Sequence, residues 1–336
     1  MQIFQEKLLK VLEMYQNDFD NIVGSFFEDK EKYINLISKY SCEMEDNVDK
    51  NYLLRARLSF SIIYYKNVQA LNKEALKNIV IYLFNEELKD RETSKYKGVG
   101  IALESLTFLL SKYNRDNKDL FEKAKKINND CAIGYDKEIR FEDDIEKLNI
   151  EYCIHYALEL GFKDLYYELI DMWKNSIKVW DRINLEKLRD FEIEIGNKEG
   201  ELEANKKLYD INKDNYNKNK QNQMLVKKHL FYLISYLSIY LENLIRLSKY
   251  EEASKVIISN IDEVKSFDSN SNASIVIADS ILKVIMAGYD KEVLWGFIKT
   301  SFNNEYYYKT LHDNFIKCAE YMNDLEMKEK VLKEIK

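Results

Sequence analysis

The stretch LISYLSIYLENLIRLSKYEEASKVIISNI, residues 233 to 261, contains the pattern that decides the fold. Before its central break the apolar residues Leu237, Leu241 and Leu244 recur at steps of four and three, which is typical of an amphipathic helix with one buried stripe. A second stretch of the same kind follows Ser248, the small residue at the break. The segment therefore predicts a helix hairpin, two antiparallel helices joined by a tight turn.

The same arrangement recurs through the second half of the chain. Two amphipathic segments flank a break with a small or turn-tolerant residue at Gly161, Gly196, Ser248, Gly288 and Asn323. Glycine and asparagine accept the positive φ that a tight connection after a helix requires. Two of the four intervals, 161 to 196 and 288 to 323, are 35 residues long, which predicts a repeat of helix hairpins.

The hairpin at Ser248 resembles the tetratricopeptide repeat (TPR), a helical repeat of about 34 residues. Its turn and the following Ala253 are similar to the G-D-Y-x-x-A junction of that family, although the family's tryptophan and helix-ending proline are missing from every unit. The resemblance covers about residues 140–336. It implies an α-solenoid of stacked antiparallel hairpins, in which first helices line a concave wall and Ala253 is buried where two helices cross.

The composition favours an all-α fold for the whole chain. Among 336 residues there are 9 glycines and no proline, the two residue types that punctuate turns and sheet folds. We therefore expect helices and no sheet, with a helical N-terminal region over residues 1–139 and the TPR-like repeats over 140–336. Residues 212–223 (NKDNYNKNKQNQ) offer little apolar surface, so we expect a loop or a frayed, exposed helix end that divides the repeats.

Charge and hydropathy argue against several kinds of partner. The 51 basic and 58 acidic residues are interspersed and give a net charge of -7, so nucleic acid is not an expected partner. The most apolar stretch, Leu230–Leu241, is far shorter than the roughly 20 residues that span a bilayer. The first residues lack the apolar core of a secretory signal, which predicts a cytoplasmic protein without a membrane partner. Four scattered cysteines form no CxxC pair, and we expect no disulfide framework, metal or other cofactor.

The TPR resemblance also implies where a partner binds, because three positions of each first helix face the concave wall. The polar residues expected there are Glu151, His155, Glu186, Asp190, Glu242, Arg246, Asp313 and Lys317. The hairpin at Gly288 has the apolar residues Ala278, Leu282 and Met286 at these positions. The combination favours a basic or amphipathic segment of a protein or peptide as the partner.

One of these faces has a second interpretation. Glu151, His155 and Glu159 follow one another at four-residue steps, so they share a helix face that could bind a metal or perform acid–base chemistry. A zinc site needs three or four protein ligands, and no other histidine-bearing helix is evident to complete one. We therefore prefer a solvated charged face.

Three functions are compatible with the sequence. A cytoplasmic adaptor that binds a protein or peptide through its repeats is the interpretation we prefer. A peptide-sensing regulator, similar to the quorum-sensing TPR regulators of bacteria and acting through its N-terminal helices, is the alternative. An enzyme accessory with an unrecognised site is a third. The sequence contains none of the common hydrolase, nucleotidase or metalloprotease motifs, so we do not expect the chain itself to be an enzyme.

Overall fold

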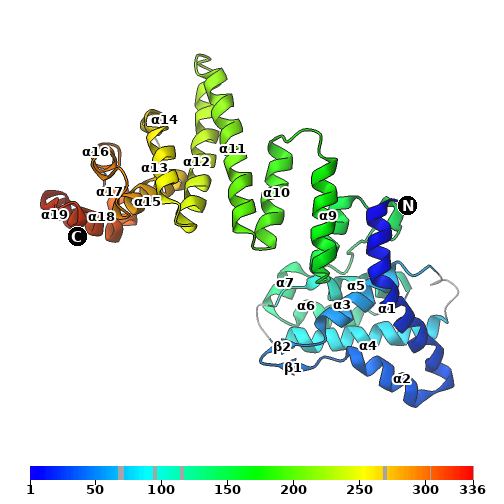
Figure 1. Cartoon of the computed structure of the whole chain (residues 1–336). Coiled ribbons are helices and arrows are strands. Elements are labelled where there is room, and N and C mark those ends of the chain that lie inside the picture. Colours follow the sequence, from blue (N-terminus) through cyan, green and yellow to red (C-terminus); the bar gives the residue numbers. More distant parts are fainter. Residues whose placement is uncertain (67–71, 94–96, 114–116, 268–270, 303, 336) are drawn as a thin grey trace. The chain divides into compact units, whose positions relative to one another are not determined.

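The computed structural model describes residues 1–66, 72–93, 97–113, 117–267, 271–302 and 304–335. The described chain is almost entirely helical, as the composition predicts, and forms two compact units, Met1–Ser176 and Ile177–Lys336 (Figure 1). We describe each unit by itself. Across the described residues, every helix is too short or too polar to traverse a bilayer.

The first unit contains nine α-helices, two 3-10 helices and two very short strands in its described residues. In chain order these are α1 Ile3–Glu28, α2 Lys30–Ile37, η1 Ser38–Tyr40, β1 Met44–Glu45, β2 Val48–Asp49, α3 Tyr52–Ile63, α4 Lys73–Glu92, α5 Gly100–Tyr113, α6 Lys118–Lys126, α7 Asn129–Gly134, η3 Ile145–Lys147, α8 Ile150–Glu159 and α9 Lys163–Ser176.

Helix α3 is the centre of the first unit. It packs against α1, α4 and α5. Ala56 and Phe60, which share one face of α3, and Leu58 on the opposite face are all fully buried. Helix α1 contributes a stripe that includes Leu8 and Leu12, buried at the four-residue spacing of one helix face. Helix α3 has apolar residues on opposite faces because neighbouring helices enclose it.

The expectation of no sheet is wrong at one place. Strands β1 and β2 pair antiparallel, with Met44 opposite Asp49 and Glu45 opposite Val48. The two turn residues between them, Asp46 and Asn47, have φ values of 49° and 64°. Aspartate and asparagine tolerate this left-handed conformation, which a two-residue hairpin turn needs, so a short hairpin forms without glycine.

The second unit is a stack of helix hairpins. Its helices are α10 Arg182–Glu194, α11 Lys198–Asn219, α12 Val226–Arg246, α13 Tyr250–Ile258, α14 Ile261–Ser266, α15 Asn272–Met286, α16 Lys291–Ser301, α17 Glu305–Thr310, α18 His312–Tyr321 and α19 Leu325–Ile335.

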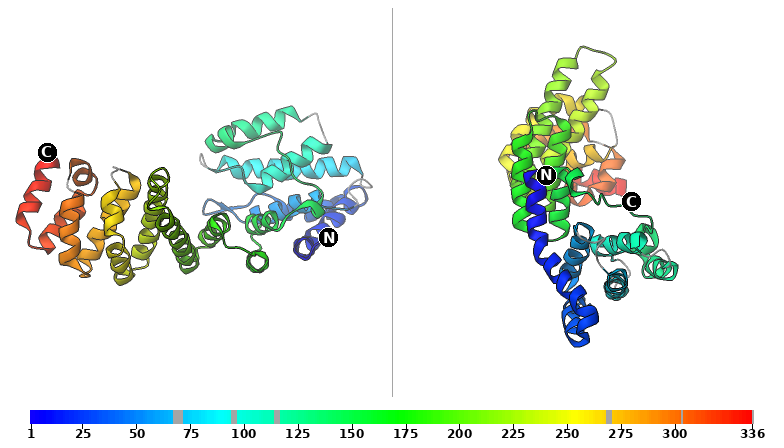
Figure 2. Two further views of the ribbon diagram at one scale, coloured as in Figure 1. Left: turned by 90° about the horizontal axis from the view of Figure 1, so that it is seen from above. Right: turned by 90° about the vertical axis from the view of Figure 1, so that its right-hand side faces the viewer.

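Consecutive hairpins of the second unit pack through neighbouring helices. Within the pairs, α10 packs on α11, α12 on α13, α15 on α16 and α18 on α19. Between the pairs, α11 packs on α12, α12 on α15 and α15 on α18, as the row of helices in Figure 2 shows. This is an α-solenoid of stacked hairpins, the fold class that the sequence predicts.

All five predicted turn residues have positive φ: Gly161 67°, Gly196 71°, Ser248 57°, Gly288 90° and Asn323 53°. Each closes its helix with the same two backbone hydrogen bonds. At the Ser248 turn, for example, the N–H of Ser248 donates to the carbonyl of Ile245 (2.9 Å) and that of Lys249 donates to Leu244 (2.8 Å). This pair of backbone hydrogen bonds is the Schellman motif, which satisfies carbonyls that the helix end leaves unpaired. The predicted turns are confirmed.

The predicted burial of Ala253 is also confirmed. Its side chain is fully buried on α13, which packs against both α12 and α15. A small side chain at this position lets the backbones of three helices approach one another closely.

The expected loop or exposed helix end at 212–223 is wrong for the first part of that stretch, whereas residues 217–223 are mostly exposed and contain the end of α11. Helix α11 continues to Asn219, and its packing against α12 buries both Asn212 and Tyr216. The amide of Asn212 donates to the carbonyl of Leu208 at 2.7 Å, which satisfies the buried polar group. The apolar content of the stretch underestimated its burial. Helix α12 covers an aromatic ring, and it also covers an amide whose hydrogen bond is made within its own helix.

The boundary between the compact units lies after Ser176, so the hairpin of α8 and α9 belongs to the first unit. Both helices pack against α1. Arg57 on α3 donates from Nε to the carbonyl of Leu160 (2.8 Å) and from a terminal nitrogen to that of Gly161 (3.3 Å). These bonds hold the turn of the hairpin to the centre of the first unit.

Candidate functional site

The predicted partner-binding residues Glu151 and His155 lie on α8 of the first unit. Glu151 is half-buried and His155 is exposed, with its ring centroid 5.9 Å from that of Tyr156. The structure adds Glu104 of α5 to this group. Burial raises the pKa of Glu104, the nearby Glu159 raises it further, and His155 acts in the opposite direction. No sequence spacing connects α5 with α8, so this neighbour was not predicted.

Glu186 and Asp190 lie on α10 of the second unit, where local partners already engage them. Glu186 accepts a hydrogen bond from the hydroxyl of Tyr236 and lies 3.8 Å from a nitrogen of Arg182. Asp190 is exposed and accepts from its neighbour Arg189 at 2.8 Å.

The remaining four predicted residues lie on α12 and α18. Arg246 forms an ion pair with Glu201 of α11, and Asp313 lies 3.2 Å from the ring of His312. Glu242 and Lys317 are exposed and have no ion-pair partner among the described residues. The part of all eight residues in binding a partner stays a prediction.

The apolar strip expected at Ala278, Leu282 and Met286 is not a binding surface. Ala278 and Leu282 are 0% exposed, and Met286 is half-buried. The reason is that α15 packs against α12, α13, α16, α17 and α18, which enclose it.

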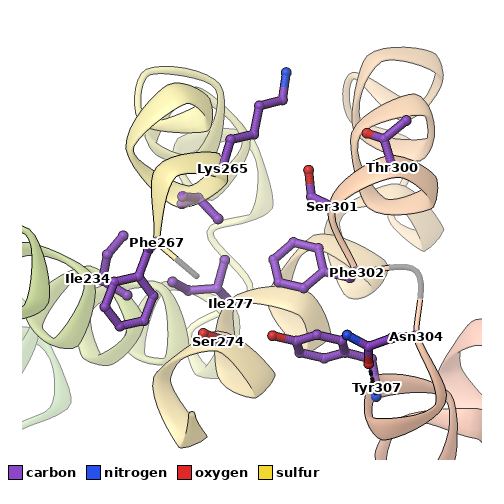
Figure 3. A pocket seen from close by; sticks show the side chains of 11 residues that line it. Ile234, Lys265, Phe267, Ser274, Ile277, Thr300, Ser301, Phe302, Asn304 and Tyr307 are labelled. Carbon is purple, nitrogen blue, oxygen red and sulfur yellow. Dashed lines mark hydrogen bonds between the residues drawn. The ribbon is translucent and has the colours of Figure 1, made fainter. Parts of the chain in front are cut away.

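The second unit instead contains a pocket that the repeat pattern did not predict. Its volume is about 600 Å³, and it opens between α12, α14, α15, α16 and α17 (Figure 3). Its apolar lining consists of Ile234, Val264, Phe267, Ile277, Phe302 and Tyr307. Its polar lining consists of Lys265, Ser274, Thr300, Ser301 and Asn304.

The two short helices α14 and α17 create the pocket, because each follows a short second helix and lies beside α12 or α15. Asn304 is the N-cap of α17 and accepts from the N–H of Tyr307 at 3.3 Å. The ring of Phe302 meets that of Tyr307 edge to face, with centroids 5.0 Å apart. This capping residue is the sequence signal that could have located α17.

Aromatic and basic side chains lie beside the pocket. Phe231 of α12 is 53% exposed, and its ring centroid is 6.3 Å from that of Phe267 in the pocket lining. The ammonium of Lys265 lies 5.7 Å from the ring centroid of Phe297 and has no carboxylate partner among the described residues. The surroundings of the pocket are therefore amphipathic, with an exposed aromatic ring and a lysine ammonium that has no carboxylate partner in the described part of the chain.

A second unpredicted cluster lies in the first unit. Cys42, Asp49 and Asp90 each offer a potential metal-ligand atom, and these atoms lie within 4.8 Å of one another. The donor set fits a metal poorly. One oxygen of Asp49 accepts from the N–H groups of Glu43 and Asn51, both at 3.0 Å, and the other accepts from Arg55. Burial, with help from Asp49, raises the pKa of the Cys42 thiol to about 11, so the thiol stays protonated. We interpret the cluster as structural.

No protein-family model matches the chain, and no curated protein matches it. Among solved structures, the chain is similar to one described as "Circular tandem repeat protein with novel repeat topology and enhanced subunit contact surfaces". The sequence identity is 11%, the TM-score is 0.21, and the match covers 98% of this chain and 71% of that chain. At this level the fold assignment rests on the helix hairpins described above.

Proposed function

We propose that the second unit is a TPR-like binding module that recognises a segment of a protein or peptide, and that the pocket of Figure 3 is where the segment is anchored. The observation that carries the proposal is an open pocket of about 600 Å³ that is lined by six apolar and five polar residues. Binding pockets have volumes of about 300–1,000 Å³ and combine apolar side chains with polar groups that fix the orientation of the ligand.

The stacked hairpins support this function. A solenoid presents the ends and faces of successive hairpins as one extended surface, and such surfaces typically bind extended segments. The Schellman turns and the buried Ala253 support the finer TPR-like assignment. The exposed Glu242 and Lys317 offer further contacts for a segment anchored in the pocket.

A displayed library of random peptides, selected on the full chain, tests the proposal. The variant Thr300→Trp places an indole at the pocket, and Thr300 is exposed, so the fold should tolerate it. Thr310→Trp on α17 is the matched control, because Thr310 is also exposed, bonds a carbonyl of its own helix and does not line the pocket. We expect selected peptides to lose binding to Thr300→Trp and to keep it with Thr310→Trp.

Two results of the selection would contradict the proposal. One is a library that yields no peptide above background, and the other is a set of peptides that bind both tryptophan variants equally well.

An adaptor and a peptide-sensing regulator share this binding step and differ in what the first unit does. Hydrogen exchange of residues 1–176, measured with and without a selected peptide, separates the two roles. Changed exchange around α3 and α4 supports the regulator, and unchanged exchange supports the adaptor.

A further inference from the structure

We infer that the pocket of the second unit selects an acidic segment that carries a bulky apolar anchor residue, an inference that rests on the proposed function. The charge of the lining is the first observation. Lys265 is the charged residue among the eleven that line the pocket, and no carboxylate lies among them. A ligand group of opposite charge is therefore favoured at this place.

The distribution of neighbouring carboxylates strengthens this point. Glu263 of α14 lies 3.4 Å from the ammonium of Lys220, and Glu305 of α17 pairs with Lys309. Lys265 is left without a carboxylate in the described structure, and the exposed Asp262 on the same helix does not line the pocket.

Two further lysines lie on the first turn of α12, the helix that contributes Ile234 to the pocket. Lys227 and Lys228 are exposed, and neither has an ion-pair partner among the described residues. The ammonium of Lys228 lies 6.0 Å from the ring centroid of Tyr232. The helix that leads to the pocket thus presents positive charge.

A hydrogen-bond donor accompanies Lys265. In Figure 3, Lys265 of α14 and Ser301 of α16 both project toward the top of the view, and the Ser301 hydroxyl has no hydrogen-bond partner among the described residues. An ammonium and a free hydroxyl together suit a carboxylate, which accepts hydrogen bonds and donates none when ionised.

The apolar residues define the anchor. Ile234, Ile277 and Phe302 line the pocket, and the exposed ring of Phe231 beside Phe267 extends this apolar surface outside it. Burial of an aromatic or large aliphatic side chain supplies most of the affinity in such sites. The lysines contribute selectivity and a faster association, because exposed ion pairs add little binding free energy by themselves.

Three fluorescent probes test this inference by anisotropy with the full chain. The first is a peptide with one tryptophan flanked by glutamates, the second has lysines in place of the glutamates, and the third is a single-stranded oligothymidylate. We expect the acidic peptide to bind about tenfold or more tightly than the basic peptide, and its affinity to fall as salt is added.

Variants assign the binding to the pocket. Lys265→Glu should weaken binding of the acidic peptide by about tenfold or more, and Thr300→Trp should abolish it. Lys333→Glu on α19 makes the same charge change at an exposed lysine outside the pocket and should leave binding unchanged. Lys265 is exposed, so its replacement should not disturb folding, which the thermal midpoint checks.

The outcomes separate this inference from the proposed function. If the basic peptide binds more tightly and Thr300→Trp still abolishes binding, the pocket binds peptides but the acidic preference is overturned. If the oligothymidylate binds, is weakened by Lys265→Glu and displaces the acidic peptide, the ligand is a nucleic acid and the inference is overturned. If neither peptide probe binds while library-selected peptides still respond to Thr300→Trp, the inference fails and the proposed function stands.

Discussion

Different kinds of interaction stabilise the interior of each of the two units. In the first unit, Arg55 is 0% exposed and donates to Glu87 from Nε (3.0 Å) and from a terminal nitrogen (2.8 Å), and it also pairs with Asp49. Arg91 donates to the other oxygen of Glu87 at 2.5 Å. In the second unit, α12 and α15 contribute long runs of buried apolar residues to one continuous hydrophobic core.

The difference lies in how local the interactions are. The ion network joins β2, α3 and α4, and Arg55 and Glu87 are 32 residues apart in the chain. The hairpins of the second unit depend on turns and stripes that each occupy a few consecutive residues. A buried ion pair requires both partners, because a single charge left in a dry interior is strongly unfavourable. The first unit should therefore respond sharply to single charge deletions, and the second to changes of size and backbone conformation.

The largest expected effect is that of Arg55→Met. Removal of the guanidinium leaves Asp49 and Glu87 buried without their shared cation, which should destabilise the first unit by about 3–5 kcal/mol. Hydrogen exchange in urea, followed separately for peptides of each unit, measures this loss. Arg182→Met is the control, because Arg182 is half exposed and its pair with Glu186 spans 3.8 Å, so the cost should stay below about 1 kcal/mol. Equal effects of the two substitutions would show that the buried ion network does not stabilise the first unit more than an exposed ion pair does.

The second prediction concerns packing in the second unit. Ala253→Trp forces an indole into a fully buried position and should cost about 1–3 kcal/mol. Val293 occupies the same place relative to its turn in the next hairpin, but its side chain is 56% exposed. Val293→Trp should therefore leave the midpoint of urea denaturation nearly unchanged. An unchanged midpoint for Ala253→Trp would contradict the close packing of α13 on α12 and α15.

The third prediction separates backbone conformation from packing. Gly196 has a φ of 71°, and a Cβ built there meets nothing within 4 Å, so Gly196→Ala should cost about 1–2 kcal/mol through backbone strain alone. Gly296 also faces open space but lies inside α16 without a positive φ, so Gly296→Ala should stabilise by about 0.5–1 kcal/mol. Thermal midpoints that shift in opposite directions are the expected result. A loss of stability in both variants would contradict the conclusion that the positive φ of Gly196 decides the effect of the substitution.

The smallest effect is expected at Asp324, the residue before α19. Its carboxylate accepts from the N–H of Met327 (3.0 Å), the indole of Trp295 (2.9 Å) and the ammonium of Lys299 (2.9 Å). The bond from Lys299 lowers the pKa of Asp324, burial opposes this, and the bonds from Met327 and Trp295 reinforce it. Asp324→Ala should cost about 1 kcal/mol near neutral pH.

The sign of the pH dependence follows from that lowered pKa. The contribution of Asp324 is present above its unfolded value of about 3.8 and is lost as the pH falls through the lower folded value. The stability gap between the wild-type chain and Asp324→Ala should therefore close below about pH 4. Glu329→Ala, at an exposed position of α19, should show no such gap. A gap at Asp324 that is independent of pH would contradict the role of its charge.

The sequence predicted those features that depend on neighbouring residues. The turns at Gly196, Ser248 and Asn323 have the expected positive φ because the requirement is set within one helix end. The helical state of α12 follows from its apolar stripe in the same way. The first part of the stretch 212–223 was misjudged because the burial of Asn212 and Tyr216 depends on α12. The apolar face of α15 was misjudged because α15 packs against five other helices.

The sequence predicted that the repeats contain a binding site, but not where that site lies or which residues line it. A binding surface on the repeats was expected, but the pocket is lined by residues from five helices, among them Ile234, Lys265 and Ser301, which no spacing in the sequence connects. The spacing of the cysteines gave no indication that Asp49 and Asp90 lie beside Cys42, because the three residues come together only in the folded chain.

By itself, the sequence determined that the chain is helical, that hairpins recur after residue 140 and where five helices end, because helix periodicity and helix termination are local properties of the backbone. Only the tertiary structure decided which hairpins share a compact unit, which face of α15 is covered and which side chains line the pocket. These are contacts between distant residues, and their geometry is fixed only when whole helices pack against one another.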